Sequence, residues 1–147
     1  MGNHIKNEVK KLINEYKTNN PFELIDCLGI NLIKFPLNGY YIYIKEYGEY
    51  NICIDSNLSD EEMTMVAAHE LGHFKLHKDK NILFISNNTY YSKDKLEKQA
   101  NLFAAELLLD DNIFSNYYNY SLEYISKGEY VSSKLVQYKF ENFSRNI

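Results

Sequence analysis

Three of the chain's four histidines lie in one short stretch, "AAHELGHFKLH" at residues 67–77, together with a glutamate. On a helix, His69 and His73 are one turn apart on the same face, so both imidazoles can bind one metal ion. Glu70 is rotated from His69 by about 100° around the axis, where its carboxylate can act as a general base on a water that the metal activates. The H-E-x-x-H spacing therefore predicts a hydrolytic zinc site with Glu70 as catalytic base. The alternative interpretation is a set of ordinary polar residues on an amphipathic helix, which predicts no third ligand nearby.

The third histidine of the stretch, His77, is not predicted to be a ligand. Eight residues along a straight helix correspond to a rise of about 12 Å, which is too far for His69 and His77 to share one ion. We expect His77 either at the helix end, where the helix dipole favours an imidazolium, or packed behind the ligands.

A third metal ligand is predicted on the next strong helix, residues 94–109. On a regular helix Glu97 shares an arc of about 100° with small, amide and apolar residues, namely Ala100, Asn101, Ala104 and Leu108. The small residues allow this helix to approach the histidine helix closely. Glu106 is about half a turn away from Glu97, so it cannot face the same metal and is interpreted as a solvated or structurally paired carboxylate. With His69, His73 and Glu97, zinc has three protein ligands and an open position for water, as in catalytic sites.

The elements before the motif are two helices and a small sheet. Residues 4–18 have apolar side chains at helical spacing, and "NPFELIDCLG" offers Asn20 as N-cap, Pro21 at the first helical position and Gly29 just past the end. Three runs rich in Ile and Tyr follow, divided by turn residues: "INLIKFP", "YYIYIKE" and "YNICID". They predict a three-stranded antiparallel meander whose last two strands form a hairpin.

The motif helix is predicted to begin at Ser59, which is followed by Glu62 in the spacing of a capping box. After the motif, residues 78–93 contain a short apolar run, "NILFI", that suits a strand or a flap beside a site. Two further helices are predicted at residues 121–128 and 131–143, the second with Ser132 as its cap. Two helices, then one small sheet, then further helices segregated after it in the sequence indicate an α+β fold rather than a βαβ fold.

Length and charge limit the class of protein. The 147 residues suit a single domain spanning 1–147. The net charge of −4 provides no basic surface for direct nucleic-acid binding. The apolar runs fall far short of the roughly 20 residues that cross a bilayer, and the polar start does not resemble a signal peptide. We therefore expect a cytoplasmic protein that binds no membrane.

Two motifs of this chain resemble the ImmA/IrrE family of metallopeptidases. They are "AAHELGHFKLH" at 67–77 and "EKQANLFAAELLL" at 97–109, and "YISKGEYVSSKLVQYKFENF" at 124–143 is a weaker match to the family's C-terminal helices. The resemblance implies a zincin-like core in which His69, His73 and Glu97 bind zinc and Glu70 is the base. The family's second motif usually ends in a proline, where this chain has Asp110.

The family resemblance implies a zinc endopeptidase that cuts a helix-turn-helix repressor and thereby derepresses a mobile element or prophage. An acidic chain suits such a basic, DNA-binding partner. Tyr90, Tyr91 and His77 are candidates for stabilising the oxyanion. One alternative is a non-hydrolysing, metal-containing regulator that binds a repressor, although the intact Glu70 argues against a purely structural site. Another is a helical interaction protein without metal.

Overall fold

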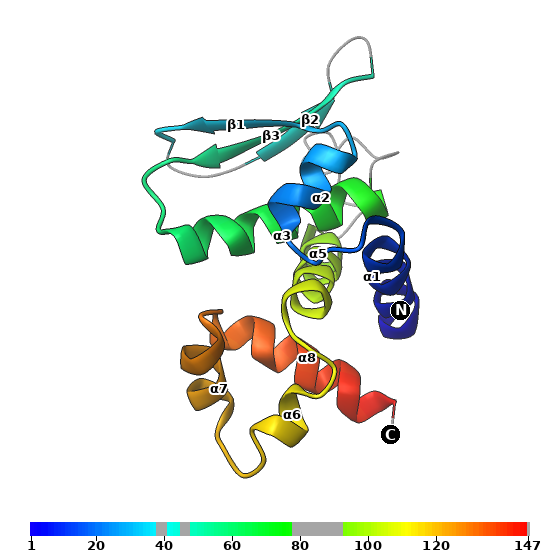
Figure 1. Cartoon of the computed structure of the whole chain (residues 1–147), viewed down its shortest axis with the longest axis vertical. Helices are drawn as coiled ribbons and strands as arrows, with labels where there is room; N and C mark the ends of the chain where they lie inside the picture. Colours follow the sequence, from blue (N-terminus) through cyan, green and yellow to red (C-terminus); the bar gives the residue numbers. More distant parts are fainter. Residues whose placement is uncertain (38–40, 45–47, 78–92, 147) are drawn as a thin grey trace.

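A computed structural model of the chain describes residues 1–37, 41–44, 48–77 and 93–146 (Figure 1). The predicted strand or flap at "NILFI" lies outside these residues. In chain order the elements are α1 (Gly2–Tyr16), α2 (Pro21–Cys27), β1 (Asn31–Phe35), β2 (Tyr41–Ile44), β3 (Tyr50–Asp55), α3 (Asp60–His77), α5 (Lys93–Leu108), α6 (Ile113–Asn116), α7 (Leu122–Glu129) and α8 (Ser133–Arg145). The α+β class predicted from the sequence is confirmed.

Side-chain caps set the starts of several helices where the sequence predicts them. The Asn20 side chain accepts a hydrogen bond of 2.9 Å from the backbone N–H of Phe22, and Pro21 is the first residue of α2. Ser59 Oγ accepts a hydrogen bond of 3.2 Å from the backbone N–H of Glu62 and so caps α3, the helix that carries His69, His73 and His77. These bonds satisfy N–H groups that have no partner inside the helix.

The sheet is mixed, so the prediction of an antiparallel meander was wrong. Its strand order is β1-β3-β2: β2 and β3 are antiparallel, as the predicted hairpin requires, whereas β1 pairs with β3 in parallel. Turn residues after β1 indicate a chain reversal but not which strand becomes the neighbour. In β3 residues 51–55 are all buried, as befits a central strand, but its polar Asn51 and Asp55 conceal that in the sequence.

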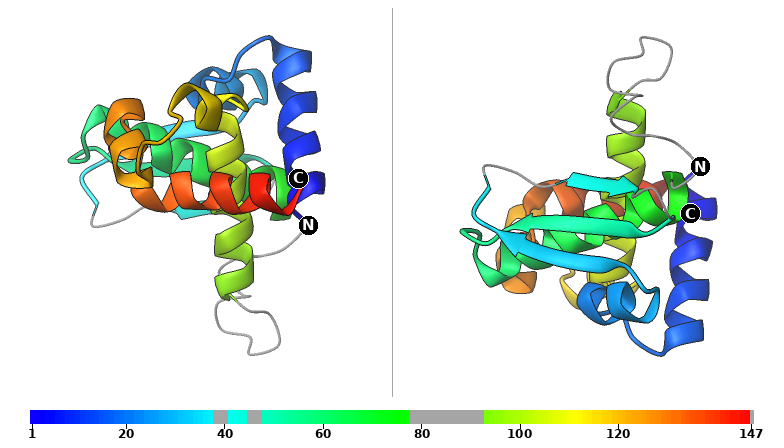
Figure 2. Two further views of the ribbon diagram at one scale, coloured as in Figure 1. Left: turned by 90° about the horizontal axis from the view of Figure 1, so that it is seen from below. Right: turned by 90° about the horizontal axis from the view of Figure 1, so that it is seen from above.

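Helices cover one face of the sheet, and a second group of helices lies beyond them (Figures 1 and 2). The main core joins α1, α2, β3, α3 and α5, and its fully buried side chains include Ile5, Leu24, Ile52, Leu71 and Phe103. At the other end α6, α7 and α8 share a smaller apolar cluster of Leu109, Ile113, Ile125 and Val136. The short helix α6 was not predicted.

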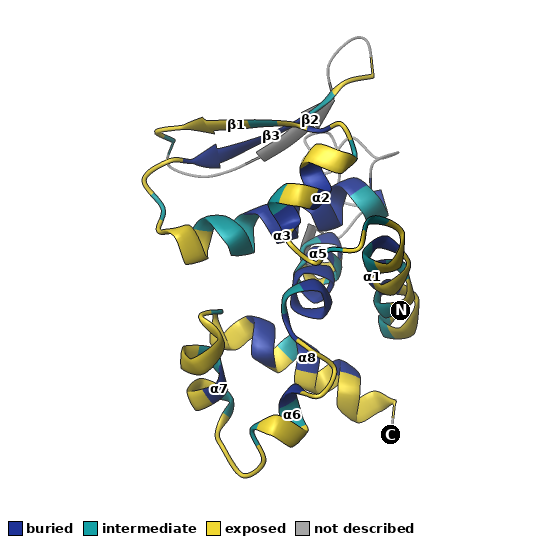
Figure 3. Ribbon diagram, in the orientation of Figure 1, coloured by how far each residue is buried: buried dark blue, intermediate teal, exposed yellow. Residues whose placement is uncertain are grey.

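The two cores meet at α5, which packs against α1, α3 and α8. The middle of α3 and most of α5 are buried (Figure 3). None of the helices in the described part of the chain is both long and apolar enough to span a bilayer. The residues predicted to do chemistry therefore lie on two helices at the centre of the fold.

Candidate metal centre

Close packing of α3 and α5 brings the predicted ligands together. A Cβ atom on Gly72 of α3 would lie 3.0 Å from Phe103 Cβ and 3.1 Å from the carbonyl oxygen of Ala100, both on α5. Ala100 and Ala104 are fully buried, as expected for small residues between two close helices. The glycine inside the H-E-L-G-H sequence therefore has a packing role, because a larger residue there would push α5 away from the histidines.

His69, His73 and Glu97 converge on one point. The Nε2 atoms of the two histidines are 3.1 Å apart. Glu97 reaches each of them from α5, with Oε2 at 3.1 Å from His69 Nε2 and Oε1 at 3.1 Å from His73 Nε2. Ligands held at 2.0–2.1 Å around a tetrahedral ion are separated by about 3.3 Å, so these spacings fit a metal ion with little adjustment.

Each histidine is held from behind by a second hydrogen bond. Nδ1–H of His69 donates to Asn101 Oδ1 at 2.8 Å. Nε2–H of His77 donates a hydrogen bond of 2.8 Å to Gln99 Oε1. Because a neutral imidazole has one donor nitrogen and one acceptor nitrogen, Nδ1 of His77 then accepts a hydrogen bond of 3.0 Å from Nδ1–H of His73. His69 and His73 thus direct Nδ1 towards a protein partner and Nε2 towards the centre, the orientation that metal-binding histidines adopt.

His77 meets both positions expected from the sequence, the helix end and packing behind the other histidines. It is the last residue of α3 and is buried, 3% exposed, with its ring packed against that of His73 rather than at the centre. Sequence reasoning placed Asn101 on the correct face but gave it no role, and it missed Gln99. Their contacts depend on the distance between α3 and α5, which no spacing within one helix reveals.

Two lone pairs and a carboxylate that face one another need a cation between them. Burial lowers the pKa of His69, but the hydrogen bond to Glu97 and the nearby carboxylates outweigh burial, and its pKa is raised. Burial lowers the pKa of His73, and the charge of His69 adds to that effect. Interaction with His69 and His73 holds the pKa of Glu97 far below its usual range. A divalent cation between the three groups would satisfy all of them at once.

Glu70 lies beside this cluster and is also buried, at 3% exposed. Ligand atoms of His69, Glu70 and His73 all lie within 4.8 Å of one another, a grouping that could hold a metal ion. Burial raises the pKa of Glu70 to about 7, with the negative charge of Glu97 adding to the effect and His69 opposing it. A carboxylate whose pKa is close to neutral is suited to exchange protons with a reacting water.

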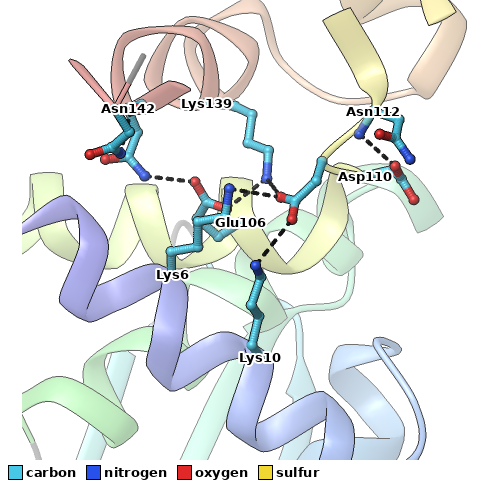
Figure 4. Close-up of polar contacts among 9 residues, drawn as sticks. Lys6, Lys10, Glu106, Asp110, Asn112, Lys139 and Asn142 are labelled. Atoms are coloured by element: carbon cyan, nitrogen blue, oxygen red, sulfur yellow. Dashed lines mark hydrogen bonds and ion pairs between the residues drawn. The ribbon is translucent and has the colours of Figure 1, made fainter. Parts of the chain in front are cut away.

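The other glutamate of α5, Glu106, belongs to a separate cluster. Its carboxylate accepts hydrogen bonds from Lys139 Nζ at 2.6 Å and from Asn142 Nδ2 at 2.9 Å, both on α8 (Figure 4). Lys139 also donates to Asp111 at 2.7 Å, and Lys6 of α1 pairs with Asp111 at 3.2 Å. Of the two roles left open for Glu106, structural pairing is the one observed.

Comparison with known proteins shows the family to which the chain belongs. The family described as the IrrE N-terminal-like domain matches residues 25–141. The chain is 37% identical to Metallopeptidase ImmA of Bacillus subtilis (strain 168), over 97% of this chain and 89% of that protein. It is 46% identical to Uncharacterized immunity region protein 2 of Bacillus phage phi105, over 78% of this chain and 74% of that protein. The chain therefore belongs to the ImmA/IrrE family of metallopeptidases.

Proposed function

We propose that the protein is a zinc-dependent endopeptidase. His69, His73 and Glu97 are the zinc ligands, in a zincin-like arrangement, and the fourth position is left for water or substrate. Two imidazole nitrogens and one carboxylate are a donor set that suits zinc. One observation carries the proposal: Nδ1 of each histidine is engaged with a protein partner, and both Nε2 atoms and the Glu97 carboxylate meet within 3.1 Å of one another.

Glu70 is the general base of the proposed reaction. When bound, zinc lowers the pKa of water to near neutrality and polarises a carbonyl group. The Glu70 carboxylate accepts a proton from the attacking water, whose oxygen forms a bond to the peptide carbonyl carbon. As the C–N bond breaks, Glu70 returns the proton to the departing amine nitrogen. A Glu70 pKa of about 7 allows both transfers near neutral pH.

One of the three candidates for oxyanion stabilisation is unsuited to that role. Both ring nitrogens of His77 are engaged, one with His73 and the other with Gln99. A donor to the oxyanion must be directed at the reacting carbonyl and cannot already be committed elsewhere. The two tyrosines, Tyr90 and Tyr91, lie outside the described residues and stay candidates.

The proposed substrate is a protein, namely a helix-turn-helix repressor whose cleavage derepresses a mobile element or prophage in the cytoplasm. Support comes from the relatives, one named Metallopeptidase ImmA and the other an immunity region protein of a phage. The chain's net charge of −4 suits a basic, DNA-binding partner and not nucleic acid itself.

Glu70→Gln tests the proposal directly. The protein and its variant are incubated with the repressor encoded next to its gene, with and without a chelator. We expect the variant to keep its zinc and to lose at least about a hundredfold in cleavage rate, because general bases contribute roughly 10²–10⁴-fold. Glu61→Gln, at an exposed position on the same helix, should cleave normally. Normal cleavage by Glu70→Gln would show that Glu70 is not the base, and binding without cleavage by the wild type would favour a non-hydrolysing regulator.

A further inference from the structure

A small cavity adjoins the metal centre on the side of α8. Its volume is about 100 Å³, it is open to solvent, and three helices contribute its lining: Met65, Val66 and His69 of α3, Asn101 of α5, and Ser132 and Leu135 at the start of α8. Met65 and His69 are one turn apart, so they lie on the same face of α3. The cavity and the metal centre are therefore neighbouring parts of one surface.

Two residues belong to both the cavity and the metal centre. His69 places its Nε2 atom at the centre, 3.1 Å from Glu97, and is held by Asn101 from the other side of the ring. A peptide whose carbonyl group reaches the centre would therefore carry a neighbouring side chain past His69 and into the cavity. Because the cavity and the metal centre share His69, we take a part of the substrate as the occupant of the cavity.

The lining also defines the chemistry of that side chain. Met65, Val66 and Leu135 supply apolar walls, and none of the described lining residues is an Asp, Glu, Lys or Arg. A charged side chain would lose its hydration there without gaining a partner of opposite charge. An enclosed cavity of roughly 150 Å³ is known to hold benzene, so about 100 Å³ suits a branched aliphatic side chain better than an indole.

We propose that this cavity binds an aliphatic side chain of a substrate residue that flanks the cleaved bond, and that Met65 determines which side chain fits. The inference rests on the proposed peptidase function. Met65 is the adjustable wall because its side chain is only partly buried and flexible, and its sulfur contacts the backbone N–H of Ser132 at 3.2 Å. Leu135, by contrast, is 5% exposed and belongs to the main core.

The test measures binding without turnover. Zinc-loaded protein is titrated calorimetrically with hydroxamates, which chelate the metal, carrying hydrogen, methyl, isobutyl, benzyl or carboxymethyl on the carbon next to the chelating group. We expect the isobutyl compound to bind at least about tenfold more tightly than the methyl compound, and the carboxymethyl compound to bind no better than the unsubstituted one.

Substitutions at Met65 should move this preference. Met65→Phe fills the cavity and should abolish the advantage of the isobutyl compound over the unsubstituted hydroxamate. Met65→Ala enlarges the cavity and should shift the preference towards the benzyl compound. Glu62→Phe, at an exposed position on the same helix, is the matched control and should keep the wild-type preference. Unchanged zinc content in each variant shows that the site is folded.

The outcomes separate the inference from the proposed function. Equal binding of all side chains to the wild type, or an isobutyl preference that survives in Met65→Phe, overturns the inference even if the repressor is cleaved. If the wild type prefers the isobutyl hydroxamate but cleaves no repressor, the inference about the cavity is supported and the peptidase proposal is contradicted. Failure of zinc-treated protein to bind any hydroxamate contradicts the zinc site itself.

Discussion

Helix α5 carries two glutamates that belong to two different polar clusters, one with a lysine and one with two histidines. Glu106 is buried against Lys139, so its cluster contains a fixed cation that is itself 3% exposed. Glu97 faces His69 and His73, and the described part of that cluster contains no lysine or arginine. The two glutamates are about half a turn apart, which directs one towards α8 and the other towards α3. The comparison shows that burial of a carboxylate does not by itself indicate a metal site. Glu97 differs from Glu106 because two imidazole nitrogens face it.

Removal of Glu97 and removal of Glu106 should therefore have different consequences. Of the two, Glu97→Ala should have the larger effect on metal binding. Loss of one of three protein ligands should weaken zinc by more than about a hundredfold, because even partners behind the ligands contribute roughly 10- to 100-fold. Elemental analysis after dialysis measures the loss. Glu106→Ala should keep stoichiometric metal in whatever fraction stays folded, so metal loss in both variants alike would show that the two clusters are not separate.

Lys139→Met should have the largest effect on stability. It leaves the Glu106 carboxylate buried without its cation, and breaking a buried pair in this way costs about 3–5 kcal/mol. Urea unfolding of the metal-free protein measures the change. Glu106→Gln combined with Lys139→Met should recover much of the loss, because no charge is then left buried. A double variant as unstable as Lys139→Met alone would mean that packing of the lysine stem, and not its charge, is what matters.

The metal cluster should respond to pH when it lacks its ion. The pKa of Glu70 is raised by burial from 4.5 to about 7. Its contribution to stability is therefore fully present below about pH 4.5 and is lost as the pH rises through about 7. The effect is on the order of 3 kcal/mol at most, at 1.36 kcal/mol per pKa unit. Unfolding of chelator-treated wild type and Glu70→Gln at pH 5 and 7.5 measures it. A wild type that loses no more stability than Glu70→Gln would contradict the raised pKa.

The smallest of these effects is expected at His77. His77→Leu removes the acceptor for Nδ1–H of His73, and loss of such a partner weakens metal binding by about 10- to 100-fold. Competition with a chromogenic chelator measures the affinity. His4→Leu, at an exposed position on α1, is the matched control and should bind zinc as the wild type does. Complete loss of metal in His77→Leu would instead make His77 a ligand.

Local chemistry made much of the site predictable. The spacing of His69 and His73 depends only on the regular helix, and the helix start at Ser59 depends on a capping pattern within four residues. The position of Glu97 followed from a face argument on α5. All of these depend on contacts between neighbouring residues or on the geometry of a single helix.

What could not be predicted depends on contacts between distant segments. The parallel pairing of β1 with β3 is set by which strand becomes central, and the polar Asn51 conceals that β3 is buried on both faces. Gln99 could be assigned no role because its contact with His77 crosses between α3 and α5. The pairing of Lys139 with Glu106 likewise joins α8 to α5.

The central claim is that the cluster on α3 and α5 needs a metal ion as its cation. Titration of chelator-stripped wild-type protein with zinc, followed by calorimetry and elemental analysis, tests it most directly. The account predicts one zinc ion per chain in the wild type and none in Glu97→Ala. Uptake of less than about a tenth of an equivalent by folded wild-type protein would contradict it.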